Sequence, residues 1–245
     1  MARVSCIVPV LNEAAIVAAR LAALQWLRMA GHELILVDGG SDDGTPAIAA
    51  PWSDHLLSSA PGRAMQMNTG AAAARGDLLW FLHLDAEPPP GAVDAMANAV
   101  ALGHIWGRFD VRLSGVEPML RLVERMMNLR SRLTGIATGD QGIFVVREVF
   151  DRVGGYPVIA LMEDIALSKR LKCVGRPACV RQRIVASSRR WEQAGIWRTI
   201  ALMWRLRLGY WFGVDPATLA RRYDAPRVID RRRGLAVRSP ANWRK

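Results

Sequence analysis

Two polar residues that follow an apolar run are the first candidates for chemistry. Residues 78–82 carry no charge, and His83 and Asp85 come directly after them. Such a run is typical of a strand buried on both faces of a parallel sheet, and open α/β sheets bind ligands at the carboxyl ends of their strands. Alternate residues of a strand point to the same side, so the imidazole and the carboxylate are expected to meet one metal ion or phosphate. An acidic residue that follows a strand is ordinarily a loop cap or a salt-bridge partner, and that alternative stays open.

A second candidate site is the acidic, glycine-rich segment that follows the apolar residues 33–37. It begins at Asp38 and continues as Gly-Gly-Ser-Asp-Asp-Gly-Thr through residue 45. The glycines allow a sharp turn and a close approach to a ligand, and Asp38 is placed to accept hydrogen bonds from a base or a ribose. The segment lacks the Walker lysine and the dinucleotide fingerprint, which excludes a phosphate cradle. An Asx-rich turn with N-capping aspartates is the alternative.

Two further loops carry polar groups. Arg63 opens a helix after Pro61-Gly62, where a guanidinium can reach a nucleobase carbonyl or a phosphate, unless it is a solvated surface arginine. Gly139, Asp140 and Gln141 lie between glycine-flanked elements and could form a floor for sugar hydroxyls, unless they form a simple turn.

The elements that position these residues alternate between strand and helix. Residues 4–10 read as a strand, and Asn12 is a good N-cap for one long helix to about residue 30. The same alternation occurs four times up to about residue 104. From residue 105 the pattern changes to a half-exposed strand over 106–113, an amphipathic helix over 117–133 and a short strand over 143–146. The pattern predicts an α/β fold with a mostly parallel, Rossmann-like sheet flanked by helices and a small antiparallel element.

Composition narrows the class of protein. The 245 residues suit one large α/β domain, and the net charge of +11 suits nucleic acid, an anionic membrane surface or a phosphorylated substrate. Cys6, Cys173 and Cys179 show neither metal spacing nor a disulfide pattern, which favours a reducing cytosol. The N-terminus lacks a signal-peptide pattern, and no apolar span reaches about 18 residues, so we expect a cytoplasmic protein that does not span a membrane.

The C-terminal region, residues 191–245, is expected to hold an amphipathic helix and a loosely ordered basic tail. Apolar residues recur at helical spacing at Trp197, Ile200, Ala201, Trp204, Leu208 and Trp211. Arg198 and Arg205 lie a heptad apart on another side of the same helix. The apolar stripe either packs on the rest of the chain or lies in a membrane interface, where tryptophan and arginine are common. The second alternative would place the protein at the inner face of the membrane and make a lipid-linked acceptor plausible.

Five motifs in order resemble those of the family 2 glycosyltransferases. They are Val8-Pro9-Val10-Leu11-Asn12-Glu13, Val37-Asp38-Gly39-Gly40-Ser41-Asp42-Asp43-Gly44-Thr45, Phe81-Leu82-His83-Leu84-Asp85, Gly154-Gly155-Tyr156 and Glu163-Asp164. The resemblance covers roughly residues 3–175. It implies a GT-A fold and transfer from a nucleotide-diphospho-sugar, usually with inversion and with a divalent cation.

The resemblance also implies roles for individual residues. Positions that hold the nucleoside in this family correspond to Pro9, Glu13, Asp38, Asp42 and Arg63. We add Asn12, Gly40, Asn68, Gly139, Asp140 and Gln141 as candidate donor contacts, and Arg190 and Trp191 as candidate phosphate contacts. The metal-binding carboxylate corresponds to Asp85 and the catalytic base to Asp164, with Glu163 as its nearest rival. A helix N-terminus is expected to keep Asp164 ionised and therefore weaken it as a base.

One departure from the family pattern concerns the metal. His83-Leu84-Asp85 stands where the family has Asp-x-Asp, and imidazole is a better ligand for Mn²⁺ than for Mg²⁺. We therefore expect Mn²⁺ to serve better, with His83 as a possible ligand.

These observations predict a GT-A domain over residues 1–190, with a nucleotide-binding half at 1–104 and an acceptor half at 105–190. The predicted partners are a nucleotide-sugar donor and an unknown acceptor, without nucleic acid. Two alternatives stay open, a nucleotide-binding protein without transfer activity and a sugar-1-phosphate nucleotidyltransferase, although the latter would need a basic first loop that is absent here.

Overall fold

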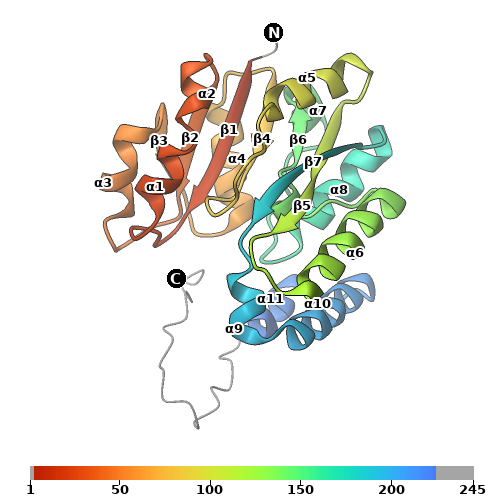
Figure 1. Ribbon diagram of the computed structural model, residues 1–245. Coiled ribbons are helices and arrows are strands. Elements are labelled where there is room, and N and C mark those ends of the chain that lie inside the picture. The colour runs from red at the N-terminus through yellow and green to blue at the C-terminus, as the bar shows by residue number, and fades with distance from the viewer. Residues whose placement is uncertain (1–2, 225–245) are drawn as a thin grey trace.

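A seven-stranded sheet forms the centre of the protein, which a computed structural model describes over residues 3–224 (Figure 1). The strand order is β3-β2-β1-β4-β6-β5-β7. The parallel half consists of β1 (Val4–Val10), β2 (Glu33–Asp38), β3 (His55–Ser58) and β4 (Leu78–Phe81). All residues of β1, β2 and β4 are buried, as expected for strands covered on both faces. The predicted α/β class is confirmed.

Helices cover both faces of this sheet. On one face lie α1 (Val17–Ala22), α2 (Gln25–Met29) and α5 (Ala92–Ala101), which pack on Cys6, Val8 and Val10 of β1. On the other face lie α4 (Arg63–Ala73), α7 (Arg147–Arg152) and α8 (Glu163–Val174), which share a cluster with Ile7. A short α3 (Thr45–Ala49) and the 3-10 turn η1 (Ala50–Trp52) connect β2 to β3. The alternation of β1 side chains therefore serves two separate cores.

The helix predicted from Asn12 to about residue 30 is wrong in two respects. The first helix begins only at Val17, and the chain divides into α1 and α2 around Leu24. Asn12 has a left-handed backbone, with φ of 53°, and does not cap a helix. Its amide instead bonds to the loop after β2, as described below.

The second half of the sheet contains the predicted antiparallel element. The short strand β6 (Phe144–Val146) pairs antiparallel with both β4 and β5 (Trp106–Leu113), and β7 (Ala178–Ala186) pairs parallel with β5. Beyond Gly107, β6 no longer pairs with β5, and side chains of α6 (Pro118–Thr134) bond to β5 instead. Asn128 accepts from the Val111 N–H at 2.9 Å and donates to the Val111 carbonyl at 3.0 Å.

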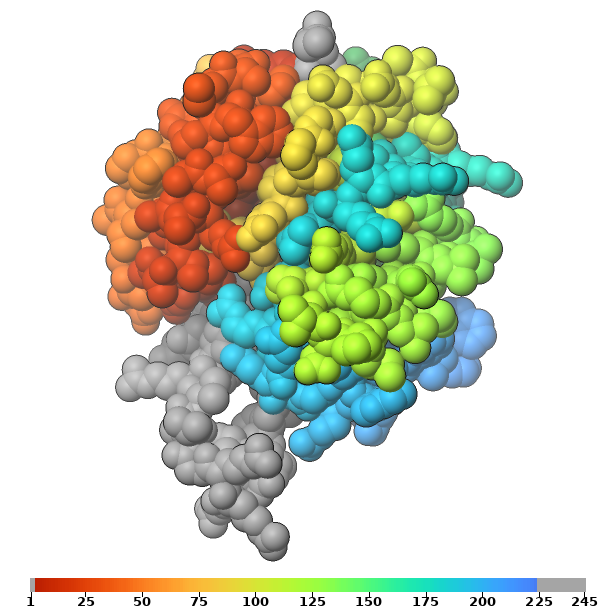
Figure 2. Space-filling model, in the orientation of Figure 1, coloured from red at the N-terminus to blue at the C-terminus, as the bar shows by residue number. Residues whose placement is uncertain are grey.

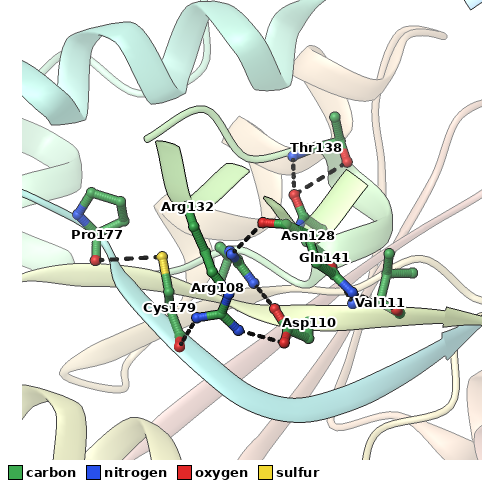
Figure 3. Close-up of polar contacts among 9 residues, drawn as sticks. All are labelled: Arg108, Asp110, Val111, Asn128, Arg132, Thr138, Gln141, Pro177 and Cys179. Atoms are coloured by element: carbon green, nitrogen blue, oxygen red, sulfur yellow. Dashed lines mark hydrogen bonds and ion pairs between the residues drawn. The ribbon is translucent and has the colours of Figure 1, made fainter. Parts of the chain in front are cut away.

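A partly buried ion cluster lies at the same place (Figure 3). Arg108 of β5 is fully buried and shares the carboxylate of Asp110 with Arg132 of α6. Arg132 also donates to the carbonyl of Cys179 on β7, at 3.2 Å. The cluster therefore links α6 to both β5 and β7.

Three C-terminal helices gather at the end of the molecule toward which β1 runs (Figure 1). They are α9 (Arg189–Ala194), α10 (Ile196–Trp211) and α11 (Pro216–Asp224). The predicted amphipathic helix is thus present, and its buried Leu206 packs with Met162 and Ile165 at the start of α8. Within residues 3–224, no helix is long and apolar enough to cross a membrane. The predicted basic tail lies mostly beyond residue 224, outside the described residues.

Candidate active site

The loops that follow β1 and β2 are fastened to one another by hydrogen bonds. The Asn12 N–H donates to the Ser41 hydroxyl at 2.8 Å, and the Asn12 side-chain oxygen accepts from the Asp42 N–H at 3.0 Å. The Glu13 N–H donates to the hydroxyl of Thr45 at 2.8 Å. Asparagine tolerates the left-handed backbone that this arrangement requires. The two loops therefore form one polar rim at the carboxyl end of the sheet.

Asp38 is committed to its own loop. Its Oδ2 accepts from the backbone N–H groups of Gly40 and Ser41, each at 2.9 Å, and its Oδ1 accepts from the Ser41 hydroxyl at 2.5 Å. The side chain is buried and forms the Asx turn that was the alternative reading of this segment. Gly40 provides the positive φ of 95° that the turn needs, and Asp42 is exposed beside it.

Residues of β1 and α4 fix the ends of β1 and β2 together. Pro9 is buried within β1, beyond the residues that pair with β4, so its missing N–H costs no ladder bond on that side.

Gln66 was not predicted from the sequence, yet it is fully buried and donates to the carbonyls of Val10 and Val37, each at 2.9 Å. Asn68 forms two bonds with the backbone of Tyr156, at 2.8 and 2.9 Å, and so holds the Gly154-Gly155 turn.

Arg63 lies among carboxylates from several segments, at the start of α4. Burial and the charge of Asp85 raise the pKa of Glu13, while the charges of Arg189 and Arg63 oppose that rise. The charge of Arg63 likewise opposes the rise in the pKa of Asp164. Its charge therefore reaches residues from the loop after β1 and from the start of α8, which brings the two predicted halves of the site together.

His83 and Asp85 lie in a turn and not in a strand. β4 ends at Phe81, and the Ala86 N–H donates to the His83 carbonyl at 3.1 Å, so the expected side-by-side placement on one strand is wrong. The His83 ring instead packs against the backbone of Gly139, where a Cβ would lie 2.5 Å from Nε2. His83 Nδ1 lies 3.4 Å from Asp140 Oδ1. Gly139 is thus a glycine because the imidazole takes the space of a side chain.

The charge of Asp140 is stabilised by basic neighbours. Burial opposes its ionisation, but the hydrogen bond and charge of His83 and the charges of Arg63 and Arg190 outweigh burial and lower the pKa of Asp140. Within residues 3–224, no three His, Cys, Asp or Glu side chains are grouped closely enough to hold a metal ion among themselves.

The acidic pair that opens α8 lies against the loop of Gly139, with Glu163 buried and Asp164 partly buried. Asp164 Oδ2 accepts from the Gly139 N–H at 2.9 Å, and Oδ1 accepts from the Ile165 N–H at 2.7 Å. Burial raises the pKa of Asp164 despite these two bonds, contrary to the expectation that the helix N-terminus weakens it as a base. Burial and the charge of Asp164 also raise the pKa of Glu163. Met162, which precedes the pair, has a left-handed backbone with φ of 70°.

Gln141 is the last residue of the 3-10 turn η2 (Gly139–Gln141), and its side chain points into the protein and not to the surface. Its side chain is fully buried, and its Oε1 accepts from the Thr138 N–H at 3.2 Å (Figure 3). This contact shapes the turn that carries Gly139 and Asp140, so Gln141 positions the predicted donor loop from inside the protein.

Arg130 lies near Asp164 and Asp140, although the sequence did not single it out. Burial lowers the pKa of its guanidinium, while the charges of Asp164 and Asp140 oppose that change. Its Nε and one terminal nitrogen are buried without a hydrogen-bond partner. The pattern of α6 shows only an amphipathic helix, and no signal in it marks the side that faces Asp164.

The two predicted phosphate contacts on α9 occupy different surroundings. The Arg190 guanidinium lies 3.8 Å from the centre of the Tyr223 ring, and its charge also reaches Asp140. Trp191 is partly buried against the apolar cluster of β5 and α6 that contains Val111 and Leu120. Arg190 therefore lies near the site, whereas Trp191 anchors α9.

Known proteins resemble this chain in both sequence and fold. Residues 5–152 match the family described as Glycosyl transferase family 2. An uncharacterized glycosyltransferase of Mycobacterium tuberculosis is 32% identical over 154 residues, which cover 58% of each chain. The mannosyltransferase from Pyrobaculum calidifontis in complex with GDP-Man and Mn²⁺ is 26% identical, with a TM-score of 0.56 over 75% of this chain and 56% of that one.

A second solved structure shares the fold alone. Glucosyl-3-phosphoglycerate synthase from Mycobacterium tuberculosis, in complex with Mn²⁺, UDP and glucosyl-3-phosphoglycerate, is 20% identical, with a TM-score of 0.57 over 74% of this chain and 70% of that one. The chain thus spans somewhat more than half the length of the curated relative and of the mannosyltransferase. The match of more than half of this chain shows that it belongs to the family Glycosyl transferase family 2, and its sheet has the GT-A fold.

Proposed function

We propose that this chain transfers a sugar from a nucleoside-diphosphate sugar to an acceptor hydroxyl with inversion, with Asp164 as the general base. The observation that carries the proposal is the position of Asp164. Its carboxylate accepts from the Gly139 N–H, burial raises its pKa, and the charge of Arg63 at the start of α4 acts on it. A raised pKa makes a carboxylate a better proton acceptor near neutral pH.

The donor would lie across the carboxyl ends of β1, β2 and β4. The fastened loops of Asn12 and Ser41 offer a polar rim for the nucleoside, and Arg63 supplies positive charge for the diphosphate. The solved relatives contain GDP-Man in one case and UDP in the other, which supports a nucleoside diphosphate without choosing the base. In this arrangement residues 1–104 hold the donor and residues 105–190 receive the acceptor.

A divalent cation fits beside Asp85. Such an ion is commonly held by one or two carboxylates together with the substrate's phosphates, so it requires no three-residue protein cluster. The charge of Asp85 acts on Glu13, so the two carboxylates belong to the same part of the rim, which Arg63 and Arg189 also reach. When bound, the cation neutralises charge on the leaving diphosphate. We keep the preference for Mn²⁺ as part of the proposal, although His83 is engaged by Gly139 and Asp140.

The transfer step forms one bond to the anomeric carbon, breaks another and moves one proton. The acceptor oxygen forms a bond to the anomeric carbon as the carbon–oxygen bond to the diphosphate breaks, and the diphosphate leaves with the electron pair. The acceptor's hydroxyl proton passes to Asp164, whose oxygens can each accept a further hydrogen bond besides those from Gly139 and Ile165. Attack on the face opposite the leaving group inverts the anomeric centre.

Donor binding and turnover measured in parallel test the proposal. Calorimetry with GDP and UDP, with and without Mn²⁺, should identify a ligand, and Arg63→Ala should weaken it about tenfold or more because a charge-assisted contact is lost. Arg152→Ala, an exposed arginine on α7, is the matched control. If the two variants bind nucleoside diphosphates equally well, the donor assignment is wrong. Binding of a donor sugar without any turnover would instead favour the nucleotide-binding protein without transfer activity.

A further inference from the structure

Two neighbouring helices expose apolar side chains along their full length. On α6 these residues follow helical spacing at Leu122, Met126, Leu129 and Leu133, the last with 77% of its surface exposed. On α10 they are Trp197, Trp204, Leu208 and Trp211, with 68% exposure at Trp197 and 72% at Trp211. The stripe on α6 was not expected from the sequence. Apolar surface of this extent, arranged on two helices, marks an interaction face.

The two stripes belong to one face of the molecule. Val123 and Met127 of α6 share an apolar cluster with Ile196 and Ile200 of α10, so these residues mark the junction between the helices. Given about 100° of rotation per residue, the exposed stripe is centred about 70° around the helix from the junction residues on α10 and about 110° from them on α6. In Figure 2, α6 in yellow-green and α10 in blue form adjoining surface. The two exposed stripes therefore lie on adjoining helices, and together they are called the two-helix face below.

The charges around this face have one sign. The segments 118–134 and 196–211 contain seven arginines and one acidic residue, Glu124. Glu124 is buried and paired with Arg121 at 3.0 Å, so it does not offset the exposed arginines. Arg125 on α6, and Arg198 and Arg205 on α10, are exposed on the sides of the stripes away from the junction. The face is apolar in the middle and basic at both edges.

We propose that this two-helix face, formed by α6 and α10, rests on the surface of a bilayer that contains anionic lipids. Tryptophan, leucine and arginine on one side of a helix are the residues of interfacial helices, with the rings at headgroup level and the guanidinium groups at phosphates. Basic edges without an exposed acidic side chain on either helix match an anionic lipid surface. The contact is peripheral.

The inner side of α10 connects this surface to the candidate base. Its buried Leu206 packs with Met162 and Ile165, the residues that flank Glu163 and Asp164. An acceptor carried by a lipid would therefore arrive close to the acidic pair. This second step rests on the proposed function, whereas binding to the bilayer does not.

Co-sedimentation of the full chain with vesicles tests the proposal. We expect binding to vesicles of phosphatidylcholine with phosphatidylglycerol, weakened by salt, and much less binding to phosphatidylcholine alone. Trp204→Ala/Trp211→Ala and, separately, Leu129→Ser/Leu133→Ser should each reduce the partition coefficient about tenfold or more, since each removes two buried apolar contacts with lipid. Leu102→Ser/Val158→Ser removes exposed apolar side chains elsewhere and should have no effect.

Several results would overturn the proposal. One is that the wild-type chain does not sediment with anionic vesicles at low salt. Another is that the control variant loses as much vesicle binding as the test variants. A third is that the α10 variant loses vesicle binding while the α6 variant keeps it. A concentration-dependent dimer that the same substitutions abolish would assign the face to a second copy of the chain. Calorimetry with the nucleoside diphosphate separates this proposal from the donor site, because a variant that no longer binds vesicles should keep its donor affinity.

Discussion

Replacement of Asp164 by asparagine is the sharpest test of the proposed base. An amide has nearly the same shape as a carboxylate but cannot take the acceptor's proton. Loss of a general base lowers turnover by about a hundredfold to ten-thousandfold. Donor affinity should change far less, because the substitution leaves the loops of β1 and β2 and Arg63 in place.

The structure also predicts that this variant is less stable. Both Asp164 oxygens accept backbone N–H groups, from Gly139 and from Ile165, so either orientation of the new amide points its NH₂ group at a donor. One partly buried hydrogen bond is lost, which costs about 1–3 kcal/mol of the free energy of unfolding.

The destabilisation should depend on pH. Because the pKa of Asp164 is raised in the folded protein, the wild-type carboxyl group stabilises the fold below its unfolded pKa, and this contribution is lost as pH rises through the folded pKa. The amide does not titrate. The variant's deficit in unfolding free energy relative to the wild type should therefore be largest under acidic conditions and smaller at neutral pH.

The assay needs a control that loosens the same part of the protein without removing a carboxylate. Ser168→Ala is suitable, because the Ser168 hydroxyl accepts from the Ala137 N–H at 3.0 Å and so also ties α8 to the segment before Gly139. Urea unfolding should show similar losses of stability in both variants. Single-turnover transfer should show a large loss of rate only in Asp164→Asn. If Asp164→Asn keeps more than about a tenth of the wild-type turnover, the base is elsewhere, and Asp140 is the next candidate.

Three further predictions concern the surroundings of the base. Asp140 raises the pKa of Asp164, so Asp140→Asn should move the acidic limb of the pH–rate profile to lower pH, and an unmoved limb or abolished transfer would contradict this assignment. Gly139→Ala should cost about 1–3 kcal/mol of unfolding free energy in urea, because the new Cβ would overlap the His83 ring. In a His83→Ala background most of this cost should disappear, and equal costs in both backgrounds would refute the packing argument. Mn²⁺ should activate transfer more than Mg²⁺, and Asp85→Asn should raise the Mn²⁺ concentration for half-activation about tenfold or more. Equal activation by both ions would exclude the preference.

The parallel half of the sheet was predictable because burial on both faces leaves a plain signal. The runs at Val4–Val10 and Glu33–Asp38 are apolar almost throughout and form the strands that were expected. The strand was expected to include His83 and Asp85, but it ends at Phe81, four residues before Asp85. Leu82 and Leu84 are buried although β4 has already ended, since apolar character reports burial and not backbone conformation.

The roles of polar side chains were harder to predict, because they depend on partners far away in the sequence. Asn12 was expected to cap a helix, but its amide bonds to the Ser41–Asp42 loop across the β1–β2 edge. Gln66 and Arg130 lie on helices whose pattern tells only that one side is buried. Which buried polar group faces the site is decided by the packing of whole elements, and one sequence does not contain that information in local form.

The contact between α10 and the start of α8 limits how the chain can be shortened. Met162 holds a left-handed backbone, which costs a non-glycine residue about 1–3 kcal/mol, and the apolar cluster with Leu206 and Leu219 opposes that strain. A chain cut after residue 195 to remove its aromatic surface would lose both leucines along with the tryptophans. We expect such a protein to keep a folded sheet but to lose the ordered turn that positions Asp164. Point substitutions at Trp204 and Trp211 are therefore the safer way to remove the exposed aromatic surface.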